Sequence, residues 1–108
     1  MKFHVQAIPP YKQAPADKKE KQHQLERAEA LKTVASTVFH GYGKLEGEIA
    51  VSIHYKRYLG GSDAANIVGG ISDTLQGICY RNDSQIVEIT YKEEKGKQDE
   101  YWVGVEER

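Results

Sequence analysis

Alternating apolar and polar residues predict four strands in this chain. The clearest alternation covers residues 48–55, where nearly every second side chain is a large apolar one, and it predicts a strand with one buried face. A shorter alternation at residues 2–8 predicts an N-terminal strand, which Pro9-Pro10 ends because proline donates no ladder hydrogen bond. Residues 86–92 and 100–105 alternate in the same way. The charged segment between them predicts a hairpin in which these two strands pair directly.

Apolar residues at helical spacing predict two helices. Asp17 begins an Asp-x-x-Glu capping pattern, so the first helix is expected from there to about residue 39, with Gly41 beyond its end. Its first turns are polar and are expected to project beyond the core. The second helix is expected to begin at Ser62, a favourable N-cap, and to stop at Gly77. Its apolar stripe consists of Ala64, Ile67, Val68, Ile71 and Leu75.

These elements give the order β-α-β-α-β-β within one domain covering residues 1–108. Runs of helix and strand in this order favour an α+β fold, with a small mixed sheet and the long first helix packed on one of its faces. The chain carries no repeats and no Rossmann or P-loop glycine pattern.

Composition is that of an ordinary soluble globular protein, with 39% hydrophobic and 29% charged residues. No apolar run approaches the roughly 20 residues of a membrane span, and the first residues are too polar for a signal peptide. We therefore expect a cytoplasmic protein with no membrane partner. The single cysteine, Cys79, excludes an internal disulfide and a thiolate metal cage.

Charge is divided unevenly along the chain, although the net charge is only −1. Residues 1–61 carry ten Lys/Arg against six Asp/Glu, whereas residues 62–108 carry five against ten. A basic half can face an anion such as a phosphate backbone, although a solvated surface has the same composition. The candidate phosphate contacts are Lys56 and Arg57 before the second helix, and Lys18, Lys19 and Lys21 at the start of the first.

The second helix and the loop after it carry the candidate chemistry. Asp63, Asn66 and Asp73 fall on the side opposite the apolar stripe, together with Gly70. Asp83 follows in the loop, and we expect its carboxylate to approach that of Asp63 if residues 78–82 run back along the helix. Such a pair suits Mg²⁺, which takes one or two carboxylates and several waters, and Mn²⁺ is also possible. Helix capping by Asp63 and a local turn at Asp83 would explain the same residues.

Two adjacent glycines interrupt this helix. Gly69 and Gly70 each cost helix stability, about 1 kcal/mol relative to alanine. They are tolerated where another segment, such as a neighbouring helix, must approach the backbone closely.

The same stretch resembles a known family. The pattern Asp63-x-x-Asn66-Ile67, then Asp73-x-Leu75-x-Gly77, then Asn82-Asp83-Ser84-Gln85-Ile86 is similar to the RusA-like Holliday-junction endonucleases. Those commonly read Asp-x-Asp-Asn, a Lys one helical turn on, Asp-x-Leu, and Asp-Asp-x-Gln. The resemblance implies a homodimer that binds four-way DNA junctions and hydrolyses two symmetric phosphodiesters with acidic residues and Mg²⁺, in recombination and repair.

Carried over residue by residue, the resemblance assigns the catalytic acids to Asp63, Asp73 and Asp83, and it gives Asn66 a supporting place at the metal. Three positions depart from the family pattern. Ala65 stands where the second acidic residue is expected, Gly69 where the lysine is expected, and Asn82 where the first of the paired Asp residues is expected. The favoured reading is a Mg²⁺-dependent junction endonuclease. The alternative is a weakened or inactive module that binds branched DNA or a protein partner without cutting.

The homodimer implied by the resemblance needs a contact surface. We expect it at the small-residue surface of Gly69 and Gly70 or at the exposed apolar residues of the predicted hairpin.

Overall fold

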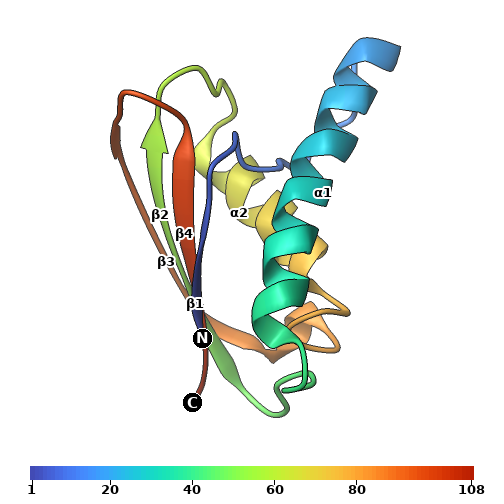
Figure 1. The fold of residues 1–108 in the computed structure, drawn as a ribbon, viewed down its shortest axis with the longest axis vertical. Coiled ribbons are helices and arrows are strands. Elements are labelled where there is room, and N and C mark those ends of the chain that lie inside the picture. The colour runs from blue at the N-terminus through green and yellow to red at the C-terminus, as the bar shows by residue number, and fades with distance from the viewer.

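The computed structural model describes residues 1–108 as two helices packed against one face of a four-stranded sheet (Figure 1). This arrangement confirms the α+β class and the predicted order of elements. The elements are β1 (Lys2–Val5), α1 (Lys18–Phe39), β2 (Ile49–Arg57), α2 (Ala64–Leu75), β3 (Ile86–Lys95) and β4 (Glu100–Glu107), with a short 3₁₀ turn η1 (Asp83–Gln85) before β3. Neither helix is long and apolar enough to cross a membrane.

The strands lie in the order β1-β4-β2-β3, so the predicted direct hairpin between β3 and β4 is wrong. β4 pairs antiparallel with both β1 and β2, whereas β3 pairs only with β2 and runs parallel to it. The turn between β3 and β4 crosses the end of β2, where the Gly96 amide donates to the Arg57 carbonyl at 2.8 Å. Alternation identified both strands, but it contains no information about which strand each one pairs with.

The core lies between the sheet and the two helices. Tyr55 faces Tyr101, Ile53 faces Val103 and Val51 faces Val105 across the β2–β4 ladder, and all six side chains are buried. The helices cover them with the buried apolar residues Leu31, Ala35 and Phe39 of α1 and Ile67, Ile71 and Leu75 of α2. α1 contacts β1 at one edge of the sheet and contacts α2 on its other side.

The helix ends agree with the sequence except at one position. The Asp17 side chain caps α1 by accepting from the Glu20 amide, as predicted. The N-cap of α2 is Asp63 rather than Ser62. The chain leaves α2 through Gly77, whose φ of 91° lies in the left-handed region that glycine adopts without strain.

The loop that leads into α2 is held firmly in place. One carboxylate, that of Asp99 in the β3–β4 turn, accepts hydrogen bonds from the amides of Tyr58, Leu59 and Gly60 and from the Tyr55 hydroxyl. Because these amides belong to consecutive residues before α2, Asp99 fixes the direction in which that helix begins.

Candidate functional site

Asp63 lies at the start of α2, on an exposed surface. Its Oδ1 accepts from the Asn66 amide at 2.9 Å, and its backbone carbonyl accepts from the Ile67 amide at 3.0 Å. The second carboxylate oxygen makes no hydrogen bond within the chain. Asp63 therefore caps the helix, as the simpler explanation requires, and still offers an oxygen to a ligand.

A polar recess of about 500 Å³ adjoins Asp63. Asp63 and Asn66 form one side of it, and Glu20 and Arg27 of α1 contribute charged groups from another element. The Arg27 guanidinium lies 5.4 Å from the centre of the Tyr11 ring and forms no ion pair with a carboxylate. A carboxylate and an unneutralised guanidinium thus line one recess, which suits a ligand that carries both a cation and an anion.

The two glycines of α2 accommodate the segment after β1, not a neighbouring helix. A Cβ atom on Gly70 would lie 2.5 Å from the Pro10 carbonyl oxygen and 2.5 Å from the Tyr11 Cα. The Lys12 amide donates to the Asn66 carbonyl at 2.8 Å and fastens the segment to the helix. Gly70 is consequently buried, although helical spacing placed it on the exposed side with the acidic residues.

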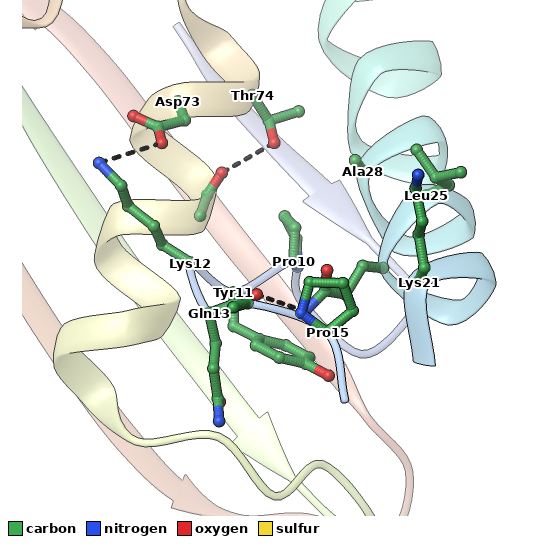
Figure 2. Close-up of a pocket in the computed structure, with 13 residues that line it drawn as sticks. Pro10, Tyr11, Lys12, Gln13, Pro15, Lys21, Leu25, Ala28, Asp73 and Thr74 are labelled. Carbon is green, nitrogen blue, oxygen red and sulfur yellow. Dashed lines mark hydrogen bonds and ion pairs between the residues drawn. The ribbon is translucent and has the colours of Figure 1, made fainter. Parts of the chain in front are cut away.

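The Lys12 side chain runs along α2 towards Asp73 (Figure 2). Its Cβ and Cδ atoms would lie 3.2 and 3.3 Å from a Cβ on Gly69, so its methylene chain fills the space that a side chain at Gly69 would occupy. Its ammonium ends 3.4 Å from Asp73 Oδ2. Asp73 is half exposed and lines a groove of about 530 Å³ between α1, α2 and the segment after β1.

Asp83 lies at the opposite end of α2 from Asp63, and the expected approach of the two carboxylates within one chain is wrong. The Asp83 amide donates to Gln76 Oε1 at 3.0 Å, and Gln76 is the C-cap of α2. From Asp63 to Gln76 the helix rises about 20 Å at 1.5 Å per residue. The segment after Gly77 turns away at the end of the helix and does not run back along it.

Asn82 and Gln85 hold the turn that carries Asp83. Asn82 Oδ1 accepts from the Ser84 amide at 2.8 Å, and Gln85 Oε1 accepts from the Asn82 amide at 3.0 Å. The Gln85 amide group also donates to the carbonyls of Leu45 and Gly47. Polar side chains therefore fix the start of β3 and leave the Asp83 carboxylate exposed.

The single chain gathers no set of ligands that would hold a divalent cation by protein groups alone. No three side chains of His, Cys, Asp or Glu gather into a group that could hold a metal ion. Asp63 and Asn66 supply oxygen atoms at one end of α2, but Asp73 and Asp83 lie elsewhere. Covalent catalysis by Cys79 is also disfavoured, because burial raises the pKa of its thiol to about 12.

Comparison with known protein families shows to which family the chain belongs. Residues 1–106 match the family described as endodeoxyribonuclease RusA. The chain belongs to the RusA family. No curated protein matches the sequence. The RusA family consists of endodeoxyribonucleases that act on DNA junctions, so the acidic end of α2 is a candidate nuclease site.

The three departures from the RusA pattern have different structural settings. Ala65 is exposed in the first turn of α2 and supplies no carboxylate there. At Gly69, by contrast, the methylene chain of Lys12 covers the position, and its ammonium ends beside Asp73, one turn further along α2. Asn82 caps the turn before β3, a task that an Asp would also perform.

Two of the predicted phosphate contacts have other partners in the chain. Arg57 forms two hydrogen bonds of 2.7 Å with the Glu93 carboxylate and donates to the carbonyls of Gly60 and Ser62. This pair holds the pKa of Glu93 below its ordinary value, chiefly through the hydrogen bonds from Arg57. The Lys56 ammonium lies 5.5 Å from the centre of the Trp102 ring. Lys56 and Arg57 therefore lie at the end of β2 with contacts inside the chain.

The three lysines at the start of α1 are exposed, as predicted. Lys18, Lys19 and Lys21 belong to turns that stand away from the sheet (Figure 1). Lys21 also lines the groove that contains Asp73. These turns lie beside the recess at Asp63, because Glu20 is part of the first turn of α1 and also lines the recess.

Sequence reasoning missed Lys12 and Arg27. Lys12 follows Pro9-Pro10 in the segment between the first strand and the first helix, and Arg27 follows the polar first turns of that helix. The glycine pair was the usable signal for Lys12, because it indicated that a segment crosses α2. No local pattern connected Arg27 to Asp63.

Proposed function

We propose that this chain is a Mg²⁺-dependent endonuclease that cuts four-way DNA junctions in recombination and repair. Membership of the RusA family over residues 1–106 is the observation that carries the proposal. The recess that combines Asp63 with Arg27 supports it, because a scissile phosphate and its counter-cation need both charges. We place the protein in the cytoplasm, where a free thiol such as that of Cys79 stays reduced.

Asp63, Asp73 and Asp83 are the proposed catalytic acids. Asp63 and Asn66 are the proposed metal ligands at the start of α2, and Asp83, at the other end of the helix, is a proposed ligand only in a homodimer, with Mn²⁺ an acceptable substitute for Mg²⁺. When bound, the divalent ion supplies activation of water and stabilisation of the charge that develops on the phosphorus oxygens. Asp73 holds the Lys12 ammonium beside α2.

Cations around α2 are the proposed DNA contacts. The Lys12 side chain crosses the position where the family pattern has a lysine, and Arg27 lines the same recess as Asp63. Lys18, Lys19 and Lys21 extend the positive surface along α1. Lys56 and Arg57 contribute less, because each already has a partner within the chain.

The second candidate is a RusA-like module that binds branched DNA or a protein partner and does not cut. Ala65 favours this alternative, because its side chain supplies no oxygen ligand where the family pattern has an acidic residue. Binding by Lys12, Arg27 and the α1 lysines would remain intact in such a module.

Junction cleavage separates the two candidates. A labelled four-way junction is incubated with the protein and Mg²⁺ or Mn²⁺, and the products are compared with those of the Asp63→Asn variant. Asn is also a good N-cap, so this variant keeps α2 while removing one negative charge. Metal-dependent cuts that Asp63→Asn abolishes support the endonuclease. Mobility shift of the junction with no cuts in either metal supports the binding module.

A further inference from the structure

The face of the sheet opposite the helices carries a row of aromatic rings. Both helices pack on the other face, so no element covers this one (Figure 1). Trp102 alternates along β4 with the buried Tyr101 and Val103 and therefore points away from the helices. Its ring centre lies 4.7 Å from that of His4 on β1 and 5.4 Å from that of His54 on β2. Three neighbouring strands thus contribute to one continuous π surface.

A hollow of about 240 Å³ adjoins these rings. Trp102 and His54 line it with aromatic groups, and Ser52 and Thr90 line it with short, exposed hydroxyl side chains. Gly104, the neighbour of Ser52 on β4, carries no side chain, and a Cβ there would lie 2.5 Å from the Ser52 Oγ. A cavity of roughly 150 Å³ accommodates a benzene ring, so this hollow has room for a nucleobase.

Free ammonium groups flank the hollow. Lys2 and Lys92 both line it, and neither forms an ion pair within the chain. The carboxylates nearest the rings, those of Glu100 and Glu94, lie 2.8 and 2.7 Å from a histidine nitrogen. The charged groups that remain available to a ligand at the hollow are therefore cations, which suits a phosphate.

Further lysines extend this surface towards the turn between β3 and β4. The Lys56 ammonium lies 5.5 Å from the centre of the indole ring. Lys56, Lys95 and Lys97 line a second hollow of about 360 Å³ at the turn. Glu88 and Glu106 lie at the other end of the face, beyond the first hollow. A chain of phosphates would follow the lysines and avoid this acidic end, which sets its path across the sheet.

We infer that this face binds an unpaired strand of DNA, with one nucleobase against Trp102 and His54 and the neighbouring phosphates on Lys92 and the turn lysines. Aromatic rings beside a basic groove are the usual means of binding a single strand, because every base has a face that stacks. The bases of a duplex stack on one another and do not reach such rings. DNA is the expected strand, since the chain belongs to a family of endodeoxyribonucleases.

The inferred site is separate from the proposed nuclease site. α2 packs on the opposite face of the sheet, so a strand on Trp102 and a junction at Asp63 would occupy different surfaces (Figure 1). Binding at Trp102 goes beyond the proposed function and does not depend on it. A protein that never cuts a junction would refute the proposed function and leave the single-strand site open to the measurements below.

The fluorescence of Trp102 tests the site directly, because the chain has one tryptophan. An oligothymidylate of about ten nucleotides, within the site sizes of single-strand-binding domains, is titrated at low salt. A base stacked on the ring should quench the emission to a saturating value. The same strand annealed to its complement should quench far less, as should inorganic polyphosphate, since neither offers an unpaired base. Absence of quenching by the single strand, or equal quenching by either control, overturns the inference.

Two lysine variants test the path of the phosphates. Lys92→Gln should weaken the binding that quenches Trp102 and reduce the slope of log Kd against log salt by about 0.7, the value for one phosphate contact on a single strand. Lys44→Gln is the matched control, because Lys44 is equally exposed but lies between α1 and β2. It should bind as wild type does. Identical titrations of the two variants would overturn the placement of the strand along β3.

Discussion

The side chain of Lys12 lies across Gly69, so two residues 57 positions apart share the space of one side chain. Lys12 reaches this place because its own backbone amide is bound to the Asn66 carbonyl of the same helix. A lysine carried by a loop thus occupies the region where the RusA pattern has a lysine carried by the helix. This relationship makes the role of Lys12 directly testable.

Lys12→Met should weaken junction binding without unfolding the protein. Methionine keeps most of the methylene chain over Gly69 and removes the charge. The ion pair with Asp73 is exposed, so its loss changes the free energy of unfolding by no more than about 1 kcal/mol. Removing one phosphate contact should reduce the slope of log Kd against log salt concentration by about one. Filter binding at several salt concentrations measures that slope, and an unchanged slope would exclude Lys12 from the DNA contact.

Gly70→Ala should destabilise the protein, whereas Gly69→Ala should not. The new methyl group at Gly70 would lie 2.5 Å from backbone atoms of Pro10 and Tyr11, and we expect a loss of about 1–3 kcal/mol. At Gly69 it would meet only the flexible Lys12 side chain, and the gain in helix propensity of about 1 kcal/mol offsets that contact. Urea unfolding of both variants gives the comparison. Equal stabilities would show that the segment after β1 does not need this close approach.

Asp99→Asn should lower stability at neutral pH by about 1–3 kcal/mol. Burial opposes ionisation of Asp99, but the hydrogen bonds from the Tyr55 hydroxyl and the three loop amides outweigh it and hold the pKa of Asp99 below its ordinary value. A depressed pKa in the folded state means that the charged carboxylate contributes its stability above the unfolded pKa of about 3.9. That contribution is lost as the pH falls through the folded pKa. The difference between wild type and Asp99→Asn should therefore be constant near pH 7 and shrink below about pH 4. A difference that grows in acid would contradict this role.

Restoring the family residues should increase cleavage. Ala65→Asp adds an oxygen ligand two residues after Asp63, and Gly69→Lys adds a helix-borne ammonium one turn later, about 6 Å along the axis. The new lysine must displace Lys12, so the double variant is best compared in both Lys12 and Lys12→Met backgrounds. We expect faster Mg²⁺-dependent junction cleavage in both, and Asp83→Asn should abolish the gain. A folded double variant that cuts no faster than the parent would argue for the binding module.

Local features of the sequence predicted most of the elements. Asp17 marked the start of α1, Gly77 the end of α2, and alternation found the strands within a few residues of their ends. The pairing of the strands was not predictable in this way. The short turn between β3 and β4 is typical of a hairpin, but β4 instead lies between β1 and β2. This pairing depends on contacts among all four strands and not on the local sequence of the turn.

In the candidate site, too, local features were predictable from the sequence and long-range contacts were not. The resemblance of the stretch from Asp63 to Ile86 to the RusA pattern was enough to indicate the family, because the motif residues lie on one helix and its flanking turns. Whether Asp83 lies near Asp63 depends on the direction of the chain after Gly77, which the glycine allows but does not determine. Lys12 and Arg27 reach the site from elements remote in sequence, and only the packed structure reveals them.

The place of β4 in the sheet has a consequence for how the protein is made. The first residue and the last strand meet directly, since the Met1 amino group donates to the Val105 carbonyl across a separation of 104 positions. During synthesis β1, β2 and both helices leave the ribosome before the strand that joins β1 to β2 exists. Contacts so distant along the chain form slowly and only once both ends are available. A product terminated before residue 100 would lack the middle of its sheet, and it should be degraded and not persist as a smaller folded domain.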